Sequence, residues 1–108
     1  MGLKYMRLVS IETRVTKMGL EELGFAGFKI LFTLYKYPEG LHINELKRKA
    51  STGAATTYRA LTVLFKYQLI TEKLMLGHRV IMLTKKGREL AEILLKANEI
   101  LEEGLEEE

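Results

Sequence analysis

The order of the hydrophobic patterns along the chain constrains its fold most. Helical spacing gives way to two short β-prone runs, at residues 71–76 and 79–83, and a helical pattern then returns. Gly77 and His78 separate the two runs, as expected for the turn of a β-hairpin. The sequence therefore predicts a mainly helical protein that carries one small hairpin.

Three helical segments are expected ahead of the hairpin. Residues 26–36 are apolar on most sides, which predicts a helix in the middle of the domain, and Pro38 ends it. A short amphipathic helix should follow at residues 42–50, and a longer one at residues 54–67. Residues 51–53 form the break between these two, and their Ser and Thr favour the start of a new helix.

The last helix should begin after Thr84, a suitable N-cap, and run to about residue 103, with Gly104 near its end. Its apolar stripe is longer than one small domain can cover, which favours a twofold-related copy of the chain as its partner. The alternative is a contact with residues 8–18, whose spacing favours a helix despite many β-branched residues. The expected dimer interface comprises Leu90, Ile93, Leu94, Ala97, Ile100, Leu101 and Leu105.

The length of 108 residues predicts one domain, residues 1–108, in which 20–84 form the core and 85–105 the dimerisation helix. Hydrophobic residues make up 47% of the sequence, which is enough to build a core. Because no apolar run could span a membrane and no signal peptide is visible, we expect a cytoplasmic protein without a membrane partner.

The net charge of +3 conceals an uneven distribution. Between residues 42 and 88 there are ten Lys or Arg and two Glu, whereas residues 89–108 contain eight Glu and one Lys. A basic middle and an acidic end indicate one surface that meets a polyanion and another that stays away from it.

The segment LTKKGREL at residues 83–90 is similar to the L-T-x-K-G-R-E-L motif with which MarR-like proteins leave the hairpin and open the dimerisation helix. About residues 24–95 resemble winged-helix regulators of the MarR, ArsR and TrmB-like kinds. The resemblance implies a winged helix-turn-helix with a long C-terminal dimerisation helix. Two positions depart from the pattern: Gln68 replaces the usual glycine, and the wing tip at residues 76–78 is short, which argues against deep reading of the minor groove by the wing.

The resemblance also implies that helix 54–67 reads DNA. By this resemblance the expected base readers are Ala55, Thr56, Arg59 and Thr62, and Gly53 allows close approach at the start of the helix. Their chemistry agrees, because arginine pairs well with guanine and small methyl-bearing side chains pack on thymine. Basic side chains around it are expected to hold phosphates, which sets register and affinity. These are Lys47, Arg48, Lys49, Lys66, Lys73 and Arg79, with His78 at the wing tip.

These features predict a sequence-specific regulator that binds double-stranded DNA as a homodimer. The alternatives are an architectural protein that coats DNA without sequence preference, and a winged helix used for protein interaction. An enzyme is not expected, because the chain has no Cys, no Asp, two His and no phosphate-binding loop.

No cofactor or metal site is expected either, since His42 and His78 have no further ligand at metal-binding spacing. The resemblance implies that a small-molecule effector could act near the dimer interface, but no residue identifies one. The remaining large apolar side chains are expected in the core: Phe25, Phe28, Phe32, Tyr35, Tyr58, Met75 and Met82.

Overall fold

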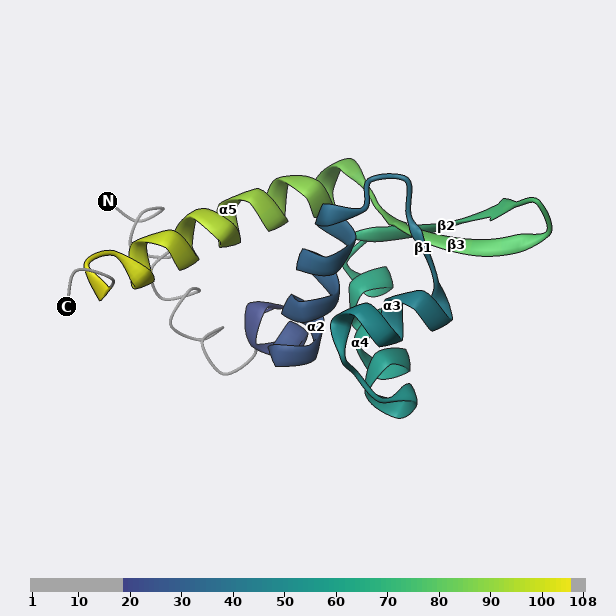
Figure 1. Ribbon diagram of the computed structural model, residues 1–108, viewed down its shortest axis with the longest axis horizontal. Helices are drawn as coiled ribbons and strands as arrows, with labels where there is room; N and C mark the ends of the chain where they lie inside the picture. The colour runs from purple at the N-terminus through teal and green to yellow at the C-terminus, as the bar shows by residue number, and fades with distance from the viewer. Residues whose placement is uncertain (1–18, 106–108) are drawn as a thin grey trace, which may run out of the picture.

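The computed structural model describes residues 19–105, which form four helices and a three-stranded antiparallel sheet (Figure 1). The predicted helix at residues 8–18 lies outside this range. The helices are α2 (Gly19–Lys36), α3 (Ile43–Ala50), α4 (Ala54–Lys66) and α5 (Lys85–Glu102). The strands are β1 (Leu41–His42), β2 (Ile70–Met75) and β3 (His78–Leu83).

The hairpin of β2 and β3 is confirmed, one residue earlier than predicted. Met75 pairs with His78, so the turn consists of Leu76 and Gly77, both with positive φ. β1 was not predicted; it lies on the other side of β3, with Leu41 opposite Ile81, and gives the strand order β1-β3-β2. Figure 1 shows the hairpin projecting well beyond the helices.

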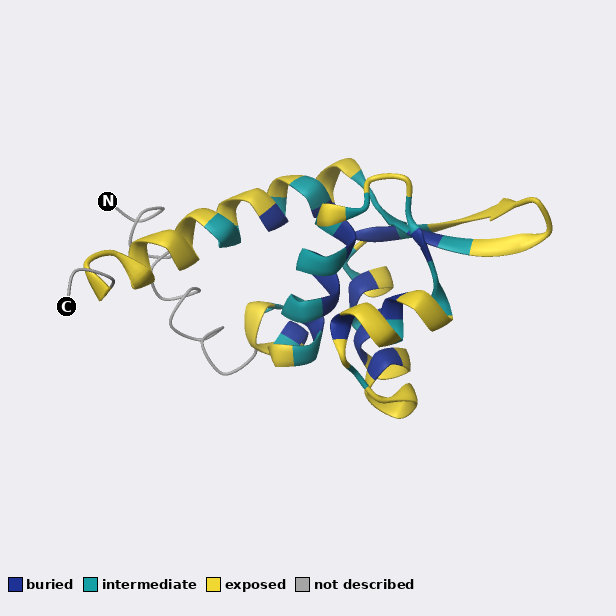
Figure 2. Ribbon diagram, viewed as in Figure 1, coloured by how far each residue is buried: buried dark blue, intermediate teal, exposed yellow. Residues whose placement is uncertain are grey.

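α2 begins seven residues before its predicted start, because a short helical segment precedes the predicted helix and is joined to it across a kink at Gly24. Gly24 has a φ of 63°, which is outside the helical region and is readily adopted only by glycine. The residues after the kink form the predicted central helix, and Ile30, Leu31 and Leu34 are fully buried there. Figure 2 shows this buried stretch of α2 facing α3, α4 and the sheet.

The core joins these helices to the sheet. It also includes Leu46 of α3, Leu64 of α4 and Ile81 of β3. Three residues predicted in the core are instead exposed, namely Phe25, Tyr58 and Met75. Phe25 directly follows the kink in α2, Met75 lies at the outer end of the hairpin, and Tyr58 lies beside the buried stripe of α4.

The break between α3 and α4 differs from the prediction. Ser51 adopts a left-handed conformation and, with Thr52, donates backbone hydrogen bonds to the last turn of α3, so both residues end that helix. The N-cap of α4 is Gly53, which has no capping side chain. The buried Thr57 hydroxyl donates to the Gly53 carbonyl at 2.7 Å and lies 2.6 Å from the Thr52 hydroxyl, which fixes the turn.

The residue that ends α4 has a backbone conformation that favours glycine. Gln68 has a φ of 60°, and Leu69 N–H donates to the Leu64 carbonyl at 2.9 Å, closing the helix. Glycine suits this left-handed position, and glutamine occupies it with some strain.

Thr84 is the N-cap of α5, as predicted. Its hydroxyl accepts a hydrogen bond from Gly87 N–H at 3.0 Å and donates to the Gln68 carbonyl at 2.7 Å. α5 is buried only near its start, at Gly87 and Ala91, and then extends away from the other helices (Figures 1 and 2). Among residues 19–105, no helix has the length and apolar character needed to cross a membrane.

Candidate nucleic-acid interface

α4 divides into a buried and an exposed side, as its sequence predicted. Thr57, Leu61 and Leu64 are buried, although the neighbouring Phe65 and Tyr58 are exposed. The exposed residues include all the proposed base readers on this helix, namely Ala55, Thr56, Arg59 and Thr62. Gly53 at the start of the helix is also exposed and has nothing within 4 Å of the place where a side chain would begin. The start of α4 can therefore approach a large partner closely.

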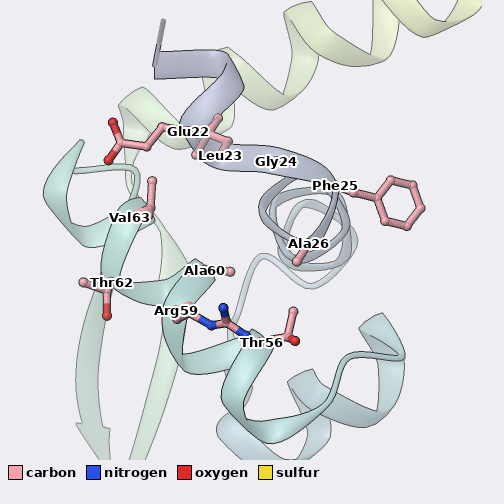
Figure 3. Close-up of a pocket in the computed structure, with 10 residues that line it drawn as sticks. All are labelled: Glu22, Leu23, Gly24, Phe25, Ala26, Thr56, Arg59, Ala60, Thr62 and Val63. Carbon is pink, nitrogen blue, oxygen red and sulfur yellow. The ribbon is translucent and has the colours of Figure 1, made fainter. Parts of the chain in front are cut away.

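Arg59 is the central cation of this exposed side. It forms no ion pair or side-chain hydrogen bond with any residue in the range 19–105. It borders a cavity of about 580 Å³ between α4 and the kinked start of α2. Figure 3 shows Thr56, Arg59 and Val63 of α4 on one side of this cavity and Leu23 to Ala26 of α2 on the other.

The three cations of α3 are in different environments. Arg48 is exposed, Lys47 is half-buried, and the Lys49 ammonium lies 4.7 Å from the centre of the Tyr37 ring. Arg48 is thus the most accessible of the three for a phosphate. Lys49 would have to leave its aromatic contact to reach one.

Lys66 belongs to a cluster that the sequence did not reveal. The Glu22 carboxylate accepts hydrogen bonds from Lys66 Nζ at 2.7 Å and from the Tyr67 hydroxyl at 2.6 Å. These two hydrogen bonds lower the pKa of Glu22. The hydrogen bond to Glu22 in turn raises the pKa of Lys66 and the pKa of Tyr67. The cluster ties the end of α4 to the first turn of α2, so Lys66 is less available to DNA than predicted.

The wing carries the remaining predicted contacts. Lys73, His78 and Arg79 are all exposed, and Arg79 Nε lies 3.9 Å from a Glu72 carboxylate oxygen. The ring of His78 meets that of His42 edge to face, with 4.8 Å between the centroids. The two histidines are far apart in the sequence, and the pairing of β1 with β3 brings them together.

A second groove, of about 240 Å³, lies between α4 and the wing. Tyr58 and Phe65 contribute to it from α4, and Glu72, Arg79 and Ile81 from the hairpin. The groove lies between α4 and the hairpin, and its lining combines apolar side chains with one cation, Arg79, and one carboxylate, Glu72.

The predicted dimerisation residues of α5 fall into two groups. Leu90 and Leu94 are half-buried and pack against the core of their own chain. The others, further along the helix, are exposed: Ile93, Ala97, Ile100, Leu101 and Leu105.

Two helices joined by a tight turn and followed by a β-hairpin, with a third helix behind them, define the winged helix-turn-helix class. This chain has the winged-helix fold. No protein-family model matches the sequence, and no curated protein matches it at a significant level.

Solved structures do match. MepR of Staphylococcus aureus, a transcription regulator of the multidrug efflux pump MepA, has a TM-score of 0.72 at 22% identity, over 94% of this chain and 78% of MepR. A complex of S. aureus MepR with DNA gives a TM-score of 0.67 at 21% identity, over 95% and 89% of the two chains. A double mutant of Lactococcus lactis ZitR in its apo form gives 0.70 at 16% identity, over 98% and 78%. At these identities the comparisons show the shared fold.

Proposed function

We propose that this protein is a transcription regulator that binds double-stranded DNA sequence-specifically as a homodimer. The observation that carries the proposal is the exposed side of α4, where Arg59 is held by no other described side chain and is surrounded by small or hydroxylated residues. This composition suits base edges in a major groove, which accept hydrogen bonds from arginine and pack against methyl groups. The MepR–DNA complex supports it, because a chain of the same fold is bound to DNA there.

The exposed apolar residues of α5 support the homodimer. Ile93, Ile100 and Leu101 are each more than half exposed on a helix that projects from the rest of the structure. Water is an unfavourable environment for such a stripe, and pairing with a second copy of the same helix removes it from water on both chains at once. A twofold dimer would present two α4 helices to an inverted repeat, with half-sites about one helical turn apart.

We also propose that the protein acts in the cytoplasm and that it binds DNA without catalysing a reaction. The absence of Cys and Asp from the sequence removes two of the residue types that enzymes use as nucleophiles and metal ligands. The cavity between α2 and α4 is our candidate site for a small-molecule effector, because its lining includes both apolar residues and Arg59 of the recognition helix. A ligand there would act directly on the side chain proposed to read bases.

Selection of bound sequences from a random pool of duplex DNA tests the function. A palindromic motif is the expected result, and binding without a motif would favour the architectural alternative. No salt-sensitive binding to any duplex would favour the protein-interaction alternative.

Two variants separate base reading from phosphate binding. Arg59→Ala should relax the selected motif at one base pair in each half-site and cost about 1–3 kcal/mol on the preferred sequence. Arg48→Ala, at an equally exposed cation on α3, should weaken binding to all sequences alike. Equal effects of both variants on all sequences would refute base reading by Arg59.

A further inference from the structure

The outer end of the wing exposes three consecutive apolar side chains. Leu74 is 74% exposed, Met75 48% and Leu76 98%. Nothing in the fold of residues 19–105 covers them, and this hairpin needs no leucine at its turn. Exposed apolar side chains gathered on a projecting element indicate a contact surface, and of these three only Leu74 and Leu76 are more than half exposed.

The conformation of Leu76 strengthens this indication. Leu76 and Gly77 form a two-residue turn with φ values of 51° and 78°, for which Asn-Gly is the preferred sequence. A leucine at the first position is disfavoured by its backbone conformation and by the exposure of its side chain. Local strain of this kind is more common at functional positions than elsewhere.

The charges around the tip indicate a polyanionic partner. Residues 73–79 contain Lys73, His78 and Arg79 and no acidic residue, and Glu72, just before them, has a carboxylate oxygen 3.9 Å from Arg79 Nε. Arg79 pairs with Leu74 across the hairpin, so both share the face that lines the groove beside α4. Lys73 is next to Leu74 along the strand and therefore lies on the opposite face. One cation on each face of the hairpin suits the two phosphate backbones that border a minor groove.

The dimensions of the wing agree with that partner. From the buried Ile70 to Leu76 the hairpin spans about 20 Å, and the minor groove next to an occupied major groove lies half a helical turn, about 17 Å, further along B-DNA. A minor groove about 6 Å wide is too narrow for two strands with their side chains, but it admits the side chain of a turn residue.

From these observations we propose that the wing tip inserts Leu76, supported by Leu74, as an apolar wedge between base pairs of the minor groove. Partial unstacking at the step and a bend of the DNA follow from such a wedge. The inference rests on the proposed function. The short tip argued against deep reading of the minor groove by hydrogen bonds, and the inference adds that the wing binds there through apolar contact instead.

Substitution of the tip residues tests the wedge. Leu76→Asn removes the apolar side chain and places a favoured residue in the turn, so its thermal midpoint should equal or exceed that of the wild type. Leu74→Thr keeps a strand-forming residue and removes most of the apolar surface of that side chain. Met75→Thr is the matched control, because Met75 lies on the other face of the hairpin from Leu74 and Arg79.

The probe is the duplex recovered by the random-pool selection, with 2-aminopurine replacing one adenine at a time. Wild-type protein should raise the 2-aminopurine fluorescence at one step in each flank, the sign of unstacking. Leu76→Asn should abolish this rise and raise the Kd at least tenfold, Leu74→Thr should do both in part, and Met75→Thr should leave the Kd within about twofold.

Two results would overturn the wedge while leaving the proposed function intact. The first is a Leu76→Asn protein with wild-type Kd and wild-type 2-aminopurine signal. This outcome would assign the apolar tip to another partner, such as a protein or a membrane surface. The second is an equal loss of affinity in Leu76→Asn and Met75→Thr. A wild-type protein that binds no duplex would instead refute the proposed function and the wedge together.

Discussion

Replacing Gly87 by alanine should destabilise the protein strongly, although alanine is the better helix former. Gly87 lies in the first turn of α5, and a β-carbon there would be 2.0 Å from the carbonyl oxygen of Leu69. Real β-carbons essentially never approach another atom within 3.0 Å, so α5 and the start of β2 would have to separate by about 1 Å. The Leu69 carbonyl also accepts the Thr84 N–H at 3.0 Å, which prevents a simple local shift.

The magnitude follows from these contacts. Overpacking costs about 1–3 kcal/mol and each weakened hydrogen bond at Thr84 about 0.5–1.5 kcal/mol, whereas alanine regains about 1 kcal/mol of helix propensity. With two such hydrogen bonds weakened, the net loss should be about 1–5 kcal/mol. For a domain of this size the melting temperature should fall by roughly 5–25 °C.

Circular dichroism during thermal and urea unfolding measures this loss, at one fixed protein concentration because a dimer's melting temperature depends on it. Lys85→Ala is the matched control, since Lys85 is exposed in the same turn and should change stability by no more than about 0.5 kcal/mol. A Gly87→Ala protein as stable as the wild type would refute the close packing of α5 on the Leu69 carbonyl.

Three further predictions concern the turns and the Glu22 cluster. Gln68→Gly should stabilise the fold by up to about 1 kcal/mol, because glycine relieves the left-handed strain; a lower melting temperature would contradict this. Thr57→Val should cost about 1–3 kcal/mol in urea unfolding, because it removes a buried hydroxyl that holds the turn before α4, and a neutral effect would show that the turn is held otherwise. The contact of Glu22 with Lys66 and Tyr67 should stabilise the fold above the ordinary pKa of a glutamate and weaken as pH falls through the lowered pKa of Glu22. At the alkaline end the contact should be lost as pH rises through the raised pKa values of Tyr67 and Lys66. Glu22→Gln should therefore flatten the acid limb of stability against pH and shift one tyrosine to earlier ionisation in an ultraviolet titration, and unchanged curves would contradict the cluster.

The parts of the fold that the sequence predicted are those set by local physics. Hydrophobic spacing places Leu61 and Leu64 on one side of α4, and that side is buried. Thr84 is followed by a helical pattern and is an N-cap in the structure. The LTKKGREL motif has a physical basis, because its threonine caps α5 and its glycine, Gly87, packs on a backbone carbonyl.

The remainder depends on contacts between distant segments. β1 has only two residues and is a strand because β3 lies beside it. The Gly24 kink interrupts α2 without any change in hydrophobic spacing. Hydrophobic spacing also does not show which apolar side chains other segments will cover. Phe25 and Tyr58 were therefore predicted in the core although they are exposed.

For the same reason, the number of cations in the sequence is larger than the number that the fold leaves free for DNA. Lys66 is 44 residues from Glu22 in sequence, and their ion pair follows only from the packing of α2 on α4. Lys86 donates to the Tyr67 carbonyl at 2.8 Å, and the Arg88 guanidinium lies 5.5 Å from the centre of the Tyr35 ring. Several charges of the basic middle segment are thus engaged within the fold.

The salt dependence of DNA binding can measure how many of these cations remain available to phosphates. Among the cations predicted to contact DNA, Arg48, Arg59 and Lys73 are exposed and make no ion pair, side-chain hydrogen bond or aromatic contact with any residue in 19–105, and the two copies of a dimer would bring about six such cations to DNA. Each phosphate contact contributes about −0.9 to the slope of log K against log salt, so the expected slope is about −5. All ten cations of residues 42–88 would give about −18 per dimer. A slope near that value would show that Lys66, Lys86 and Arg88 leave their internal partners on binding. Glu22→Gln, which removes the ionic partner of Lys66, should steepen the slope if Lys66 can reach a phosphate.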